Sequence, residues 1–426
     1  MKNLIVKPDD QRIEKILKRG EIFDKEFLPI VMELIDKVKE NGDQAIRELT
    51  LKYDHFDILD GFTLDHSSLK SHFDNLPGKL KEALVTAKEN IINYHKNQLE
   101  KTWMYETEEG SILGAKVTPL SKVGVYVPGG KAVYPSTVLM NVLPAKVAGV
   151  KEIYMVTPAT NGNVNDTVLG AAYLAGVDKV FKIGGAQAIA ALAYGTETVP
   201  KVDKIVGPGN IFVALAKKMV FGTVDIDMIA GPSEILVIAD EFSNPELVAA
   251  DMLSQAEHDE LASAIAITNS TKLAEKIALE LEKQLSLIPK KGIAERSLGE
   301  FGAIIVCEDL DEACEVANNI APEHLELYVK TPFEYLNKIK NAGAIFLGEN
   351  TPEAMGDYIA GPNHTLPTNG TARFFSPLGT YDFLKRSSII NFSKNALLKY
   401  GNMVVTMAQF EVLNAHAESV KKRLKK

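Results

Sequence analysis

The fold class is decided by the stretch Val123-Gly124-Val125-Tyr126-Val127, which runs into Pro128-Gly129-Gly130 and then into a helical pattern after Pro135-Ser136-Thr137. A short apolar run rich in valine that ends at Pro and Gly predicts a buried strand. The same unit recurs, with strands expected over 151–156, 179–183, 201–206, 235–239, 264–268 and 303–306. Strands that alternate with helices at this spacing form parallel βαβ units, so we predict an α/β fold.

The chain also carries a weak internal echo. Segments 124–157 and 236–268 share a strand, helix, strand layout about 111 residues apart, which predicts two Rossmann-like βα halves with a ligand crevice between them or at a switch point. The first 105 residues are mostly helical, and the chain after Gly370 is loop-like until a final helix from about Met403. We expect an N-terminal arm (1–20), a first α/β domain (21–124 with 239–375), a second α/β domain (125–238) and an extended C-terminal tail (376–426).

Composition narrows the class of protein. The 426 residues are 46% apolar and 24% charged, which is typical of a globular protein with more than one core. The net charge of −9 disfavours nucleic acid as a partner. No run of 18 apolar residues exists, and the N-terminal apolar run is too short for a signal peptide, so we expect a cytoplasmic protein without a membrane span. Cys307 and Cys314 are not expected to form a disulfide or a thiol catalyst.

A possible metal site lies near residue 255. The segment 251–258 continues a helix expected to begin at Asn244-Pro245, so Gln255 and His258 at i, i+3 share one face. An imidazole nitrogen and an amide oxygen there could reach one ion, although a plain polar helix face is the simpler interpretation. Asp357, in the Gly- and Pro-punctuated loop 356–368, is a further candidate ligand, unless it serves only turn formation.

Other histidines lie in equally specific surroundings. Pro322 ends a helix, and Glu323-His324 follow at a strand start, where a carboxylate and an imidazole suit acid–base work or form a simple surface ion pair. His364, in the loop 356–368, could contact a polar substrate. His416 falls on a stripe with Val412 and Val420 that looks buried, where a lone histidine is more often a core residue.

Two glycine-rich turns follow strands and open helices. They are Gly184-Gly185-Ala186-Gln187 and Gly207-Pro208-Gly209-Asn210, and neither has the G-x-G-x-x-G pattern. Helix N-termini of this kind can hold the phosphates of a cofactor. The residues alone therefore predict an α/β enzyme with a possible His/Asp/Gln metal site and a phosphate-binding edge, and they leave substrate and reaction open.

Taken together, these segments closely resemble the histidinol dehydrogenase family. The resemblance covers about residues 123–420. It implies an NAD-dependent oxidoreductase that oxidises L-histidinol to L-histidine through L-histidinal with two NAD⁺ and water, the last step of histidine biosynthesis. The matching segments are Val123–Gly130, Gly184–Gly195, Val206–Asn210, Ile226–Glu234, Ser254–His258, Ala321–Leu325, Gly356–Thr368 and Ala415-His416.

The resemblance also implies roles for particular residues. One Zn²⁺ per subunit would be bound by Gln255, His258, Asp357 and His416. Acid–base chemistry would fall to Glu323 and His324, and NAD⁺ would contact Tyr126, Gln187 and Asn210. The family forms a homodimer with an exchanged C-terminal tail, so His416 would serve the partner subunit's site. Substrate contacts would come from Ser233, Gln255, His258, His324, Asp357, His364, Glu411 and His416.

Three alternatives remain at this point. A related zinc- and NAD-dependent dehydrogenase could act on another amino alcohol or a diol, although His364, Glu411 and His416 favour histidinol. A zinc hydrolase could use a metal-bound water with Glu323. A non-catalytic metal-binding module would turn over no amino alcohol. NADH absorbance after addition of NAD⁺ and histidinol separates histidinol oxidation from a zinc hydrolase.

Overall fold

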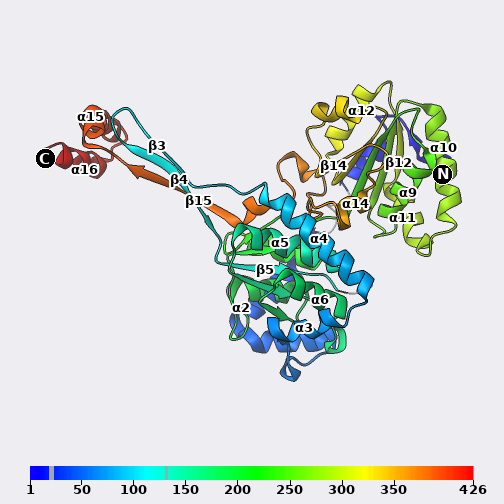
Figure 1. Ribbon diagram of the computed structural model, residues 1–426, viewed down its shortest axis with the longest axis horizontal. Helices are drawn as coiled ribbons and strands as arrows, with labels where there is room; N and C mark the ends of the chain where they lie inside the picture. Colours follow the sequence, from blue (N-terminus) through cyan, green and yellow to red (C-terminus); the bar gives the residue numbers. More distant parts are fainter. Residues whose placement is uncertain (19–23, 130–132, 426) are drawn as a thin grey trace.

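The computed structural model describes residues 1–18, 24–129 and 133–425, which form two lobes and a projecting arm (Figure 1). Each lobe contains one six-stranded sheet, and a sheet of three strands forms the arm. Among the described residues, no helix combines the length and the apolar character needed to cross a membrane.

The first lobe contains the sheet β2-β7-β6-β5-β8-β9. Its strands pair in parallel except β2, which is antiparallel to β7. The strand predicted at Val123–Val127 is confirmed as the central β5, and Val123 and Val125 are fully buried. Gly130, expected in the turn after it, lies outside the described residues. The bounds are β2 (Thr63–Asp65), β5 (Lys122–Tyr126), β6 (Glu152–Val156), β7 (Lys179–Phe181), β8 (Lys204–Val206) and β9 (Asp225–Ile226).

Helices cover both faces of this sheet. On one face, α2, α7 and α8 share a core that includes Ile46, Ile189 and Leu215. On the other face, Ile91 of α4 packs with Leu139 of α5 and with α6. Each buries an apolar stripe, as expected for amphipathic helices against a sheet. The bounds are α2 (Asp24–Asp54), α3 (His66–Asp74), α4 (Gly78–Lys96), α5 (Pro135–Ala148), α6 (Asp166–Ala175), α7 (Gly185–Tyr194) and α8 (Ile211–Val220).

The second lobe contains the parallel sheet β1-β12-β11-β10-β13-β14. The predicted start of α9 is confirmed, because the Asn244 side chain caps the helix by accepting from the Glu246 N–H at 3.0 Å. The strands are β1 (Ile5–Val6), β10 (Glu234–Ala239), β11 (Ser263–Thr268), β12 (Ala303–Val306), β13 (His324–Tyr328) and β14 (Ala344–Leu347). The helices are α1 (Gln11–Lys18), α9 (Pro245–Ala256), α10 (Thr271–Leu285), α11 (Lys291–Phe301), α12 (Leu310–Ile320), α13 (Pro332–Tyr335) and α14 (Glu353–Tyr358).

The two lobes repeat one topology. The first sheet contains β7-β6-β5-β8-β9 and the second contains β12-β11-β10-β13-β14. If β5 and β10 are each counted as strand 1, both sheets have the order 3-2-1-4-5. This is the doubly wound order of Rossmann-like folds. The expected echo is confirmed as β5-α5-β6 and β10-α9-β11, and the predicted α/β class with two Rossmann-like halves is correct.

The structure divides the chain differently from the predicted domain limits. A limit between residues 124 and 125 falls inside β5, and α2 to α4 cover the first sheet, although Asn90 of α4 also donates to the Ile359 carbonyl oxygen at 2.8 Å. The N-terminal arm predicted over 1–20 adds β1 to the edge of the second sheet, although residues 19 and 20 lie outside the described chain. The reason is that an apolar stripe marks a helix as buried without marking the sheet that buries it.

The arm combines two distant parts of the sequence. β15 (Leu384–Asn391) pairs antiparallel with β4 (Ile112–Pro119), which pairs with β3 (Trp103–Glu106). At its end, α15 (Lys394–Phe410) and α16 (Asn414–Leu424) pack on each other, away from both lobes (Figure 1). The prediction of one helix from about Met403 is therefore wrong. Two helices are present, separated at Val412, whose φ of +60° is left-handed.

Candidate active site

Buried polar residues gather at the amino ends of β10 and β13, which are neighbours in the second sheet. Glu323 comes directly before β13, as predicted from the break at Pro322. The Glu323 N–H donates to Glu234 Oε2 at 3.1 Å, and the Glu234 N–H donates to Glu323 Oε2 at 2.9 Å. This reciprocal pair of hydrogen bonds fixes both carboxyl groups at the edge of the sheet.

His324 lies beside this pair and is only 3% exposed. Its Nδ1 is 2.9 Å from the Glu234 carbonyl oxygen, which can only accept, so Nδ1 carries the proton in the neutral ring. Nε2 makes no hydrogen bond to any described residue and lies 3.5 Å from Asp357 Oδ1. A buried imidazole with one ring nitrogen fixed and the other beside a carboxylate can accept and release a proton at that nitrogen, as acid–base catalysis requires.

The two predicted acid–base residues have strongly perturbed pKa values. Burial raises the pKa of Glu323 to about 8. Burial alone would lower the pKa of His324, but the carboxylates of Glu353, Glu323 and Asp357 outweigh it and hold that pKa well above its ordinary value. Perturbed groups that are grouped in this way are typical of catalytic sites.

Gln255 and His258 meet as predicted, although the helix is shorter than expected. α9 ends at Ala256, and His258 lies in the following turn, where the Gln255 and His258 side chains approach to 3.3 Å. The hydrogen-bonding groups of the Gln255 amide are satisfied when its nitrogen donates to Glu353 Oε1 and Oε2, at 2.6 and 2.9 Å. The amide oxygen then faces His258, which is the orientation that metal ligation by an amide requires.

Two further side chains, His258 and Asp357, have the protonation states that metal ligands need. The His258 side chain keeps exposed surface, yet the surrounding protein desolvates it and lowers its pKa, which favours the neutral imidazole. Burial would raise the pKa of Asp357, but the adjacent His324 side chain and the charges of His364 and His258 outweigh it and lower that pKa. Gln255, His258 and Asp357 thus carry an amide oxygen, a neutral imidazole and a carboxylate, which are ligand types that zinc accepts.

Glu353 is the residue of this site that sequence reasoning missed. His324, Glu353 and Asp357 each bring one potential ligand atom within 4.8 Å of the others. Glu353 is buried, its N–H donates to Glu326 Oε1 at 2.8 Å, and its carboxylate accepts from the Gln255 amide. The available signal was spacing, because Glu353 precedes Asp357 by four residues at a helix start after Pro352.

The loop 361–368 connects this site to the first lobe. His364 Nδ1 donates to the Asp357 carbonyl oxygen at 3.0 Å, and its Nε2 lies 3.4 Å from Thr137 Oγ1 in the first turn of α5. Asn363 donates to the Met140 carbonyl oxygen at 2.6 Å. Burial lowers the pKa of His364, so its ring is neutral. Ser233, the residue before β10, is half-buried at the same edge of the sheet.

The three residues expected to contact NAD lie at the carboxyl edge of the first sheet. Tyr126 ends β5, and its hydroxyl accepts from the Gly185 N–H at the start of α7 at 3.1 Å. Gln187 is buried in the first turn of α7. Asn210 caps α8, accepting from the Val213 N–H at 3.2 Å. This edge is the switch point between β5 and β8, where doubly wound folds bind ligands, and α5 begins at the same edge.

Comparisons with known proteins identify the family of this chain. The family model described as histidinol dehydrogenase matches residues 17–424. The chain is 56% identical to the histidinol dehydrogenase of Aquifex aeolicus over 415 residues, covering 97% of this chain and 96% of that protein. The chain belongs to the histidinol dehydrogenase family. The family predicted from the sequence is therefore correct.

Other members match along nearly their whole length. The histidinol dehydrogenase of Geobacter sulfurreducens is 53% identical over 418 residues, covering 98% of this chain and 97% of that protein. The crystal structure of histidinol dehydrogenase from Elizabethkingia anophelis superposes with a TM-score of 0.93 at 37% identity, covering 99% of this chain and 97% of that one. The predicted enzyme class, an oxidoreductase of this family, is confirmed with the family.

Two residues given to the site by the family resemblance are not part of it within one chain. Glu411 and His416 are exposed and lie in the arm, at the end opposite the lobes (Figure 1). The expectation that His416 falls on a buried stripe is wrong, because the buried side of α16 is represented by Ala417, and His416 points to another side.

Neither cysteine is prepared for covalent chemistry. Cys307 and Cys314 are free thiols buried in the second lobe. Burial raises the pKa of Cys307 to about 12 and that of Cys314 to about 11, so neither provides a thiolate near neutral pH.

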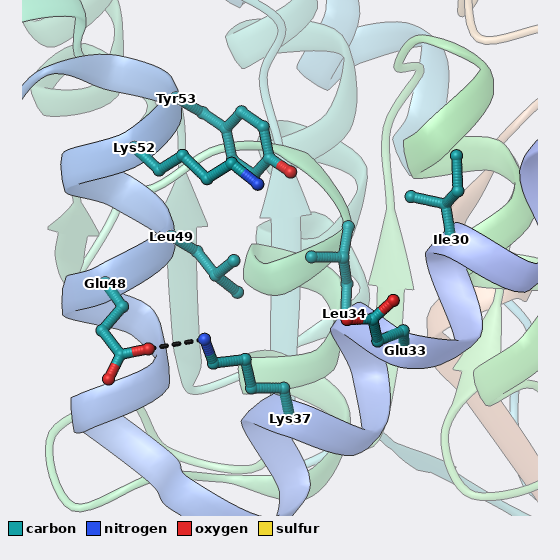
Figure 2. Close-up of a pocket in the computed structure, with 8 residues that line it drawn as sticks. All are labelled: Ile30, Glu33, Leu34, Lys37, Glu48, Leu49, Lys52 and Tyr53. Atoms are coloured by element: carbon teal, nitrogen blue, oxygen red, sulfur yellow. Dashed lines mark ion pairs between the residues drawn. The ribbon is translucent and has the colours of Figure 1, made fainter.

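A cavity of about 360 Å³ lies away from this site, between the two halves of α2. α2 turns back at Gly42, whose φ of +49° is left-handed, and Figure 2 shows the Lys37–Glu48 ion pair across the opening. None of the residues predicted for the family's site lines this cavity. Its lining residues are Ile30, Glu33, Leu34, Lys37, Glu48, Leu49, Lys52 and Tyr53.

Proposed function

We propose that this chain oxidises L-histidinol to L-histidine through L-histidinal, reducing two NAD⁺ and consuming one water. The observation that carries the proposal is the contact between an acid–base pair and a set of metal donors. His324 Nε2 lies 3.5 Å from Asp357 Oδ1, in a chain that belongs to the histidinol dehydrogenase family. The reaction draws on NAD⁺, so we keep the cytoplasmic location expected from the sequence.

We assign one Zn²⁺ to Gln255, His258 and Asp357. The fit rests on the amide oxygen of Gln255 facing His258 and on the ionised state of Asp357. A zinc ion there would orient the amino and imidazole groups of histidinol and offset the negative charge around His324. Zinc has no redox chemistry, so the hydride passes to NAD⁺.

His324 is the base for both oxidations. Its Nδ1 proton is held by the Glu234 carbonyl, so Nε2 takes the hydroxyl proton of histidinol as hydride leaves the carbinol carbon. This step yields histidinal and the first NADH. Glu323 then takes a proton from the water that adds to the aldehyde carbon. After His324 has released its first proton to solvent, the hydrate anion loses its second hydride to another NAD⁺, and His324 takes the remaining hydroxyl proton to leave the carboxylate.

Substrate and cofactor occupy the two facing edges. Ser233 and His364 lie on the substrate side, at the amino edge of the second sheet. Tyr126, Gln187 and Asn210 contact NAD⁺ at the carboxyl edge of the first sheet. His364 Nδ1 donates to the Asp357 carbonyl oxygen and Thr137 Oγ1 donates to His364 Nε2, and these contacts connect the two edges and support a hydride path between them.

The active form is a homodimer that exchanges its arms. The arm projects from its own lobes and exposes large apolar side chains, among them Phe410 at 87% exposed. Exposed apolar surface of this kind is typical of a protein interface. His416 of one subunit would complete the zinc ligands of the other, and Glu411 would reach the same substrate.

The test is a direct assay. Purified dimer loaded with zinc is mixed with NAD⁺ and L-histidinol, and we expect two NADH per histidinol consumed together with L-histidine as the product. NADH formed faster with another amino alcohol or a diol would indicate a relative with a different substrate. Absence of NADH with every alcohol, with or without amide hydrolysis, would refute the assignment.

A further inference from the structure

A buried ion pair lies beneath the turn 207–210. The Nζ of Lys217 in α8 contacts Oδ1 of Asp227, which follows β9, and the two side chains are 2% and 1% exposed. Removing two charges from water costs several kcal/mol each, and apolar residues of similar size are often as stable. Asp227 belongs to the specific run Ile226–Glu234, and the reaction described above leaves it without a role.

Both charged side chains form hydrogen bonds with the backbone of Gly207. Lys217 Nζ donates to the Gly207 carbonyl oxygen at 2.8 Å, and the Gly207 N–H donates to Asp227 Oδ2 at 2.7 Å. Asp227 Oδ1 also accepts from the Met228 N–H at 2.7 Å. Gly207 has a left-handed φ of +109°, and a Cβ there would lie 2.1 Å from the Tyr126 carbonyl oxygen. Gly207 is therefore held on one side by the ion pair and on the other by β5.

The position of Gly207 determines where the following turn leads. Gly207 joins the end of β8 to Asn210, which caps α8 and is itself exposed. Lys217 lies on α8, so the ion pair connects the helix, the turn and the segment after β9. We propose that Lys217 and Asp227 are positioning residues for the cofactor, which preset the turn 207–210 and the start of α8 for NAD⁺. This inference rests on the proposed function, because it takes this edge as the NAD site.

The test uses two buried lysines of the same lobe. Lys217→Met removes the ion pair while keeping the length and most of the volume of the side chain. Lys204→Met is the matched control, because Lys204 is also buried and pairs with Asp225 at 3.0 Å, but donates to Asp382 rather than to the turn. Titration calorimetry with NAD⁺ on the zinc-loaded dimer measures the dissociation constant. We expect it to rise on the order of 10–100-fold in Lys217→Met and to stay unchanged in Lys204→Met.

A second variant guards against simple loss of folding. Lys217→Met leaves Asp227 as an unpaired buried charge, which is strongly destabilising. The double variant Lys217→Met with Asp227→Asn contains no unpaired charge and should fold, with NAD⁺ binding weakened as in the single variant. Zinc content and the KM for histidinol should match wild type, whereas a purely structural role would lower the melting temperature without changing NAD⁺ affinity.

The outcomes separate this inference from the proposed function. Weak NAD⁺ binding in the double variant, with normal binding in Lys204→Met, supports it. Three results would overturn it. NAD⁺ binding could be unchanged in the double variant, or weakened equally in Lys204→Met. The double variant could also fail to fold while Lys204→Met folds. If wild type still reduces NAD⁺ with histidinol in those cases, the proposed function stands. A wild type that does not bind NAD⁺ overturns both.

Discussion

Replacing Glu323 by glutamine tests the division of labour between the two acid–base residues. Glutamine keeps the shape of the side chain, and its amide oxygen still accepts from the Glu234 N–H, now at 2.9 Å from Glu323 Oε2. The backbone bond from residue 323 to Glu234 is untouched. Burial raises the pKa of Glu323, so the neutral amide avoids the cost of ionising a buried carboxyl, and we expect a folded enzyme at least as stable as wild type above about pH 5.

The rate effect should differ between the two oxidations. Glutamine cannot take a proton from water, and loss of a positioned base costs about 10²–10⁴-fold, or about 2.7–5.5 kcal/mol, in oxidation of supplied histidinal. The first oxidation relies on His324, whose Nδ1 lies 3.7 Å from Glu323 Oε2. That ring keeps Glu353 and Asp357 as neighbours, so we expect the first step to slow by no more than about tenfold, the effect of one unit in its pKa.

The assay is a single turnover at pH 9. Burial raises the pKa of Glu323 to about 8, so the ionised carboxylate predominates at pH 9 and falls away as the pH drops below 8. Glu323→Gln with histidinol and NAD⁺ should give a burst of one NADH per site, and wild type should give two. His324→Asn is the comparison variant and should slow both oxidations. Equal slowing of both steps by Glu323→Gln, with zinc content at the wild-type level, would refute the reasoning.

Three further predictions follow from the same structure. Removal of metal by a chelator should abolish activity but leave the helical circular dichroism signal, because the donors come from separate elements of large cores; loss of that signal near room temperature would make the site structural. Mixing His416→Ala with His258→Ala subunits should restore activity after subunit exchange, because a mixed dimer then holds one intact site; exchange proven by mass without activity would place His416 in its own chain's site. Burial raises the pKa of Asp251, which shares a hydrogen bond with Glu326, to about 6. The unfolded chain therefore loses this proton first, and the native state is destabilised as pH rises from about 4 to about 6. Asp251→Asn should gain stability over wild type between pH 4 and pH 7 in thermal melts, and an equal difference at both pH values would contradict this.

The sequence by itself determined the local features of this protein. The strand at Val123–Val127, the helix start at Asn244-Pro245 and the strand start after Pro322 were all predictable, since each depends on side-chain periodicity, capping or proline within a few residues. The approach of Gln255 to His258 was predictable for the same reason, although the end of α9 at Ala256 was not. The family was predictable because its motifs are local as well.

Tertiary structure alone decided which local features meet. The apolar stripes of α2 to α4 fit either sheet, and only long-range packing places them on the first one. In the sequence Glu353 resembles an ordinary residue at a helix start, and only folding places it against the Gln255 amide. Asp227 gains its contacts with Gly207 and Lys217 only after β8, β9 and α8 have packed. The physical reason is that hydrogen bonds between residues far apart in the chain depend on the relative placement of whole elements, which no short window of sequence encodes.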